Sequence, residues 1–322
     1  MFETRFRQLI DGELDQEQSL AFLSSQRDQI WTGEELALAA QILRDRMTRV
    51  ACSEPLLDTC GTGGDHQSTI NISTAASLVL AACGVAVAKH GNRAVSSTSG
   101  SSDVLQVLGL PVDMEAGLVV KQLNTCSWAF CFAPRFHPRL KALAPLRKSL
   151  GFPTIFNYLG PLCNPCLVQY QILGVGKRAL LDPMAQALAR LNIKRAVVVH
   201  GEPGIDEVSL EGETHVRLIE GSTVSEHTWL PADFGLERSS LDDIRCHDAT
   251  TSAAHLLQIF EGKTVPGTPW VLANAAAGLF VAGRVKSLSD GIHQAKEVVR
   301  SGSVMKTLQA LQAFQTSHTA AS

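Results

Sequence analysis

The feature that most constrains the fold is a glycine-rich run, DTCGTGGD at residues 58–65, in which three glycines occupy four positions. The apolar pair Leu56 and Leu57 before it is typical of a strand. Glycine tolerates positive φ and allows close approach to the main chain, so such a loop can point several N–H groups at one anion. A glycine-rich turn alone is usually only a turn, and this one matches neither GxxxxGK[ST] nor GxGxxG.

A helix is expected after this loop, because NIST at residues 71–74 precedes the alanine-rich run Ala75 to Ala82. Asn, Ser and Thr are favoured at helix starts. The free N–H groups and partial positive charge of a helix start attract phosphate. Two features that can bind an anion therefore follow one another in the chain.

A second polar stretch follows a second strand signal, Val85 to Ala88. It consists of KHGNR at residues 89–93 and the hydroxyl-rich run VSSTSGSSD at 95–103. In open α/β sheets, ligands gather beyond the carboxyl ends of the strands. The hydroxyls can donate to phosphate oxygens and Lys89 can supply positive charge. Together with the glycine loop, this stretch indicates a phosphate site; a solvated polar loop is the alternative.

Strand and helix signals alternate along most of the remaining chain, which predicts an α/β fold with a mostly parallel central sheet and helices around it. Val197 to Val199 is continuously apolar, as in a strand buried on both faces. Further strands are expected at 128–132, 170–175 and 196–199, an antiparallel edge pair at 214–219 and 225–230, and helices at 102–108, 117–123, 182–191, 272–281 and 290–314.

Residues 1–50 read instead as helices, with Phe2, Phe6 and Leu9 at helical spacing. Thr32 and Glu35 have the spacing of a capping box. We expect a small N-terminal helical domain of residues 1–50, joined by about 134–160, and a larger α/β domain of residues 51–322 that carries the phosphate site.

The composition excludes some classes of function. Apolar residues make up 45% of 322 residues, enough for a full core, and the formal charge of −3 argues against a surface that binds polyanions such as nucleic acid. No apolar run approaches the ~20 residues of a membrane span. The polar start lacks a secretion signal, and the eight cysteines are expected to be buried free thiols. These features favour the cytoplasm.

Two adjacent acids, Asp206 and Glu207, follow the buried strand signal that ends near His200 and Gly201. Adjacent acids on a loop are usually only solvated. Mg²⁺, however, prefers oxygen ligands and usually bridges carboxylates to substrate phosphates. Beside a phosphate site, the pair is a candidate magnesium site.

Several long motifs in one order make the chain similar to the anthranilate phosphoribosyltransferase family, over roughly residues 10 to 310. The motifs are GTGGD (61–65), NIST (71–74), KHGNR (89–93), SGSSDVLQVLG (99–109), FNYLGPLCNP (156–165), HG (200–201) and GIDE (204–207). The resemblance implies transfer of phosphoribose from phosphoribosyl pyrophosphate (PRPP) to anthranilate in tryptophan biosynthesis, with Mg²⁺ as cofactor. It also implies a homodimer formed through the helical domain.

The resemblance also implies which residues form the site. Contacts to PRPP fall on Gly61, Gly64, Asp65, Thr69, Asn71, Ser73, Thr74, Lys89, Asn92, Ser96, Ser97 and Ser101. Contacts to anthranilate fall on Gly61, Asn92, Arg147 and His137, and magnesium ligands on Ser73, Asp206 and Glu207. No residue is expected to act as acid, base or nucleophile, because the aromatic amine that attacks is already neutral at pH 7.

Arg147 lies in a basic segment that would otherwise be read as a solvated helix face. A guanidinium matches the two oxygens of a carboxylate, which suits the acid group of anthranilate. His137 could equally be a packed, hydrogen-bonded histidine. Two positions depart from the family pattern: His66 stands where glycine is common, and Tyr158 lies within FNYLGPL.

Two other functions are weighed. A pyrimidine nucleoside phosphorylase would share the fold and run a related ribosyl transfer, but the Asp206-Glu207 pair and the NIST and KHGNR motifs argue against it. A non-catalytic, nucleic-acid-binding paralogue would be expected to have a degraded GTGGD motif and a basic overall charge. This chain has neither.

Overall fold

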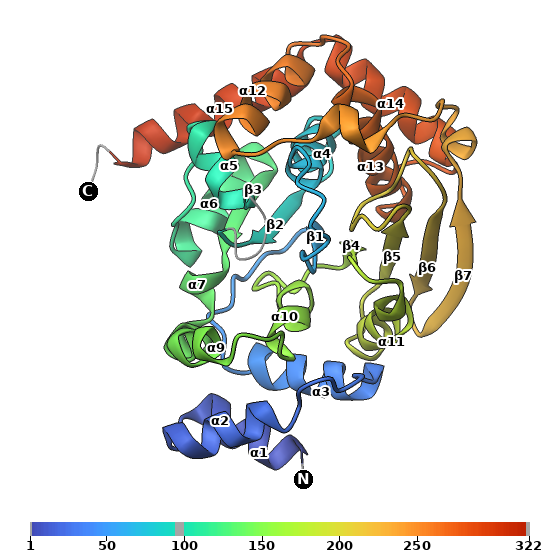
Figure 1. Cartoon of the computed structure of the whole chain (residues 1–322). Coiled ribbons are helices and arrows are strands. Elements are labelled where there is room, and N and C mark those ends of the chain that lie inside the picture. Colours follow the sequence, from blue (N-terminus) through green and yellow to red (C-terminus); the bar gives the residue numbers. More distant parts are fainter. Residues whose placement is uncertain (1, 94–99, 320–322) are drawn as a thin grey trace.

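A seven-stranded sheet forms the centre of the computed structural model, which describes residues 2–93 and 100–319 (Figure 1). The strand order is β3-β2-β1-β4-β5-β6-β7; the first five are parallel, and β6 and β7 run antiparallel at one edge. The strands are β1 Leu57–Gly61, β2 Val87–Gly91, β3 Trp128–Phe132, β4 Tyr170–Gly174, β5 Arg195–Gly201, β6 Thr214–Glu220 and β7 Thr223–Trp229. The predicted α/β class and the antiparallel edge pair are confirmed.

Helices cover both faces of this sheet. They are α1 Phe2–Asp11, α2 Gln16–Ser24, α3 Gly33–Arg44, α4 Ile72–Ala82, α5 Ser101–Val107, α6 Ala116–Cys126, α7 Ala133–Phe136, α8 Pro138–Ala142, α9 Ala144–Leu150, α10 Phe156–Leu159, α11 Leu181–Arg190, α12 Ala249–Phe260, α13 Gly267–Val281, α14 Leu288–Arg300 and α15 Ser303–Thr319. Short 3-10 helices lie at Gly160–Leu162, Arg178–Leu180, Pro231–Phe234 and Leu241–Ile244. No helix among the described residues has the length and apolar character that a membrane span requires.

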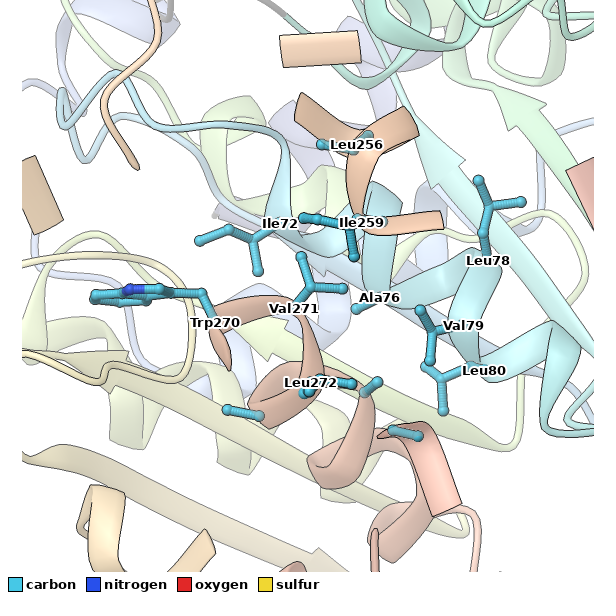
Figure 2. Close-up of a cluster of buried hydrophobic side chains, with 14 of the residues drawn as sticks. Ile72, Ala76, Leu78, Val79, Leu80, Leu256, Ile259, Trp270, Val271 and Leu272 are labelled. Atoms are coloured by element: carbon cyan, nitrogen blue, oxygen red, sulfur yellow. The ribbon is translucent and has the colours of Figure 1, made fainter. Parts of the chain in front are cut away.

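One face of the sheet packs against α4 and α13. Leu57, Phe130 and Ile172 point into this core, as the alternation of side chains along a strand requires. Figure 2 shows Ala76 of α4 beside Val271 of α13, with side chains of α12 above them. Burying such side chains stabilises the fold by about 1.5–3 kcal/mol each. Helix α13 is buried almost all round.

The other face packs against α3, α10 and α11, and the N-terminal helices lie beyond them (Figure 1). Helices α1 and α2 contact α8 and α9, so residues from 1–50 and 134–160 meet. The division into two domains stays a prediction. The capping box of Thr32 and Glu35 does start α3; a second one, of Asp15 and Gln18, starts α2 and was not predicted.

The final helix and the ends of β2 and β1 differ from the sequence-based expectation. The final helix is two helices, because the chain breaks at Gly302, which has φ +72°. Strand β2 continues through Lys89 to Gly91, so Lys89 lies within the strand instead of beyond its end. Strand β1 likewise continues to Gly61. Pairing with neighbouring strands keeps both segments extended past their apolar residues.

Candidate active site at the strand ends

Four neighbouring strands, β2, β1, β4 and β5, each end at a glycine, and the loop that carries the acidic pair lies on the ends of the last three. A Cβ at Gly174 would lie 1.6 Å from the main-chain O of Asp206. One at Gly61 would lie 2.3 Å from Oδ2 of Asp206, and one at Gly201 2.7 Å from the main-chain O of Glu207. The glycines therefore leave the space that the acidic loop occupies.

A cavity of about 270 Å³ opens above these strand ends. It is bounded by the glycine loop, the start of α4, the end of β2, the start of α5 and the acidic pair. Its lining residues are Cys60, Gly61, Thr62, Gly63, Gly64, Asp65, Ser68, Thr69, Ile70, Asn71, Ile72, Ser73, Lys89, His90, Gly91, Asn92, Arg93, Gly100, Ser101, Asp206 and Glu207.

The glycine loop turns sharply here, with φ +65° at Gly63 and +76° at Gly64. The N–H of Thr62 donates to the main-chain O of Gly174 at 2.9 Å, which anchors the loop to β4. His66 also has positive φ, +57°, and its side chain is exposed. This backbone conformation explains why glycine suits that position, and histidine is among the other residues that adopt it more often than most.

Two main-chain N–H groups, one in the glycine loop and one at the start of α4, were expected to bind an anion. In the structure both donate to the acidic pair. The N–H of Gly63 donates to Oδ2 of Asp206 at 2.9 Å, and that of Ser73 donates to Oε1 of Glu207 at 3.0 Å. Asn71 caps α4, as predicted, by accepting the N–H of Thr74. The loop and the helix start are thus tied to the two acids.

Lys89 is almost fully buried beneath the cavity. Its Nζ donates to the main-chain O of Thr59 at 2.5 Å and to Oγ of Ser73 at 3.2 Å. Burial lowers the pKa of Lys89, and the negative charge of Asp58 opposes that shift. The lysine was expected to supply positive charge to a phosphate site; in the structure its Nζ is held between the main chain and Ser73.

Asp58 and Asn164 support the strands beneath the cavity, and neither was given a role from the sequence. Oδ1 of Asp58 accepts the N–H of His90 at 3.0 Å, and Oδ2 accepts Nδ2 of Asn164 at 2.9 Å. Nδ2 of Asn164 also donates to the main-chain O of Ala88 at 2.8 Å. A carboxylate in an otherwise apolar strand run was the available signal, because a buried charge needs a partner.

The acidic pair has strongly perturbed ionisation. Burial, and then the negative charge of Asp65, raise the pKa of Asp206 to about 7. Burial and the charge of Asp206 raise the pKa of Glu207 to about 8, against the opposing charge of Lys89. Crowded acids with raised pKa values are stabilised by a nearby cation, so their environment suits a bound metal ion.

The donors at this point fit magnesium. Ser73, Asp206 and Glu207 supply oxygen atoms only, as a hard cation requires. Across residues 2–93 and 100–319, no group of three or more His, Cys, Asp or Glu side chains forms a closed metal site. Mg²⁺ needs none, because it keeps several waters and takes substrate phosphates as ligands.

Comparison with known proteins decides the family. Residues 53–305 match the model of the "Glycosyl transferase family, a/b domain". The anthranilate phosphoribosyltransferase of Syntrophomonas wolfei is 42% identical over 308 residues, which cover 96% of this chain and 91% of that protein. The one from Petrotoga mobilis is 42% identical over 313 residues, 97% of this chain and 91% of that protein. The chain belongs to the anthranilate phosphoribosyltransferase family.

Solved structures of the family superpose closely on this fold. The enzyme of Thermus thermophilus gives a TM-score of 0.90 at 37% identity, covering 97% of this chain and 94% of that one. The Saccharomyces cerevisiae enzyme in complex with PRPP and Mg gives 0.86 at 30% identity, covering 94% and 86%. The same enzyme with 4-fluoroanthranilate gives 0.89 at 27% identity, covering 98% and 92%.

Most residues that the family resemblance implied lie together around the cavity. Those that line it are Gly61, Gly64, Asp65, Thr69, Asn71, Ser73, Lys89, Asn92, Ser101, Asp206 and Glu207. Thr74 does not, because its side chain is buried beneath the helix start. Ser96 and Ser97 lie outside the described residues.

Arg147 and His137, which the family resemblance implied as contacts to anthranilate, do not line the cavity. The guanidinium of Arg147, in α9, lies 5.2 Å from the centre of the Phe156 ring. The ring of His137 is buried 5.2 Å from that of His90, which does line the cavity. Burial lowers the pKa of His137 to about 4 and that of His90 to about 3, so both are neutral at pH 7.

Proposed function

We propose that this chain transfers the 5-phosphoribosyl group of PRPP to the amine of anthranilate, giving N-(5-phosphoribosyl)anthranilate and pyrophosphate in tryptophan biosynthesis. The observation that carries the proposal is the meeting of the glycine loop, the start of α4 and the Asp206-Glu207 pair around one cavity, in a chain of this family. PRPP carries several negative charges at pH 7, and these elements together offer donors and a cation site.

Ser73, Asp206 and Glu207 would hold magnesium, whose charge stabilises the diphosphate of PRPP as it leaves. With the two acids holding the ion, the N–H groups of Gly63 and Ser73, which now donate to these acids, would be available to phosphate oxygens. These donors lie on a glycine turn and a capped helix start that the fold already holds in place. Preorganised donors of this kind stabilise developing charge without reorganisation.

The ribose carbon becomes positive as pyrophosphate departs, and the attacking amine needs no base because it is neutral. Gly61 and Asn92 line the cavity from neighbouring strand ends and would flank the amine. We therefore assign no acid, base or nucleophile. Catalysis by positioning and electrostatics is sufficient, since both reactants are brought to one point.

Arg147 and His137 are proposed to act on the anthranilate side. Burial alone lowers the pKa of the Arg147 guanidinium, so no described carboxylate neutralises it. A cation held on an aromatic ring without an acidic partner is suited to the carboxylate of a substrate. His137 would act by packing against His90.

Replacing Arg147 by Ala is expected to raise the apparent KM for anthranilate roughly tenfold to a hundredfold, the worth of one charge-assisted hydrogen bond. The KM for PRPP should change little. Lys148→Ala removes an exposed cation from the same helix and serves as the matched control. Steady-state kinetics with each substrate varied in turn checks the result. A larger change in the KM for PRPP would mean that Arg147 faces the other substrate.

A homodimer is proposed through the helical region. The side chain of Ile30 is 87% exposed, next in the chain to a groove of about 360 Å³ between α1 and α2 that Phe2 and Phe22 line. An exposed apolar side chain beside an apolar groove suits contact between two copies. Light scattering should give twice the chain mass, and a monomeric mass would contradict this assembly. We place the enzyme in the cytoplasm, where its eight free thiols would persist.

The proposed reaction is tested by following the fluorescence of anthranilate, which should fall only when PRPP and Mg²⁺ are both present. Omitting either should abolish the change. If the chain instead cleaved thymidine with phosphate and ignored PRPP, it would be a nucleoside phosphorylase and the proposal would be wrong.

A further inference from the structure

The loop that carries the acidic pair has no regular secondary structure between β5 and β6, so those of its buried main-chain groups that are not paired within the loop need other partners. Val208, directly after Glu207, is fully buried. Its N–H donates to Oδ1 of Asn274 at 2.9 Å, and its C=O accepts Nδ2 of the same side chain at 3.2 Å. One amide thus pairs with both polar groups of Val208, as a neighbouring strand would.

Asn274 is itself held rigidly. It lies within α13, is 2% exposed, and its Nδ2 also donates to the main-chain O of Trp270 at 3.0 Å. Helix α13 packs against α4 (Figure 2), the helix whose start supplies Ser73. The acidic loop and the helix start are therefore tied to the same part of the core.

The amide also lies near one of the two acids. A small cavity of about 10 Å³ is lined by both Asn274 and Glu207, together with Ser73 and Thr59. A shift of the amide would therefore reach Glu207 through the main chain at Val208, in the part of the fold that Glu207 itself lines.

We infer that Asn274 is a positioning residue for the proposed metal site: by fixing the main chain at Val208, it holds Asp206 and Glu207 in place at the strand ends. This inference rests on the proposed function, in which the two acids hold magnesium. Asn274 touches no substrate and takes no part in the chemistry. Loss of residues that orient metal ligands typically weakens metal binding 10–100-fold.

The test measures binding of Mn²⁺ in the presence of PRPP, by electron paramagnetic resonance of the free ion. We expect Asn274→Ala to raise the dissociation constant roughly 10–100-fold. The Mg²⁺ concentration for half-maximal rate should rise by the same factor, with the KM for anthranilate unchanged. Asn274→Asp keeps an acceptor for the N–H of Val208 but sets a carboxylate oxygen against the main-chain O of Val208 and of Trp270, so it should also weaken Mn²⁺ binding.

Val281→Ala is the matched control, because it removes buried volume from the same helix far from the acidic loop. Val281 is fully buried at the end of α13. The preceding carbonyl, that of Phe280, accepts a hydrogen bond from Arg195 at the start of β5, the end of that strand away from the cavity. This variant should lower the melting temperature and leave Mn²⁺ binding unchanged.

Wild-type Mn²⁺ binding in Asn274→Ala, with thermal stability lowered as in the control, would show a purely structural role and overturn the inference. Hydrogen exchange of the wild-type chain provides a check that needs no variant: the N–H of Val208 should be protected, and fast exchange would also overturn it. A wild-type chain that neither binds Mn²⁺ with PRPP nor turns over would overturn the proposed function itself, and this inference with it.

Discussion

Asp206→Asn together with Glu207→Gln should lower kcat roughly a thousandfold while the chain stays folded. The amides keep the shape of the side chains and can still accept the N–H groups of Gly63 and Ser73. They lose the negative charge that would hold magnesium against the leaving pyrophosphate. A loss of about 4 kcal/mol in transition-state stabilisation corresponds to this factor and is typical for charge stabilisation in a site. Single-turnover kinetics across a range of Mg²⁺ concentrations measures it.

The same double variant should lose activity but gain stability. The pKa of Asp206 is raised to about 7 and that of Glu207 to about 8, whereas both groups ionise near pH 4 in an unfolded chain. Between about pH 4 and pH 8 the folded chain holds more protons, so the free energy of unfolding falls as the pH rises. The amides of the double variant do not ionise, so its free energy of unfolding does not fall with pH at these two positions. Its melting temperature at pH 8 with a metal chelator should therefore exceed that of the wild type.

The matched control makes the same charge change in the same loop, by Glu202→Gln with Glu213→Gln. Both side chains are exposed, and neither lines the cavity. We expect unchanged turnover and no gain in stability. If the control lost as much activity as the Asp206 and Glu207 variant, the overall charge of the loop, and not the metal site, would explain the effect.

Local patterns in the sequence were sufficient to predict the sheet, because strand and helix signals depend on neighbouring residues. The capped start of α4 at Asn71 follows from one residue and its successors. The strand ends were harder: β2 was expected to end before Lys89, whose charge suggested a loop, yet pairing with β3 keeps this lysine in the strand. A buried lysine needs partners such as the main-chain O of Thr59, and sequence spacing does not show them.

Contacts between distant segments account for what the sequence did not reveal. The pairing of Val208 with Asn274 joins residues 66 positions apart. The sequence around neither residue identifies the other as its partner, because any buried amide side chain could form hydrogen bonds with a buried main chain. The same holds for the acids: their bonds to Gly63 and Ser73 depend on how the loop lies over the strand ends, which is set by the whole sheet. Arg147 and His137 were named from resemblance alone, and their roles remain predictions.

Gly174→Ala should reduce kcat/KM roughly a hundredfold through geometry alone. The added Cβ would lie 1.6 Å from the main-chain O of Asp206 and 2.4 Å from its carbonyl carbon. Neither atom belongs to a flexible side chain, so the loop itself must move away by more than an ångström. Misplacing catalytic groups by about 1 Å costs on the order of a hundredfold. Steady-state kinetics at varied Mg²⁺ should show both a lower kcat and a higher metal requirement.

The control for Gly174→Ala is a glycine where an added methyl group meets no neighbouring atom. Gly117 lies within α6 without a positive φ, and a Cβ added there would meet no described atom within 4 Å. Gly117→Ala should keep full activity and gain up to about 1 kcal/mol, because alanine favours the helix. Normal kinetics in Gly174→Ala would mean that the acidic loop can relax from the strand ends without consequence. The metal site would then not depend on the glycine at the end of β4, and the role given to these strand ends would be wrong.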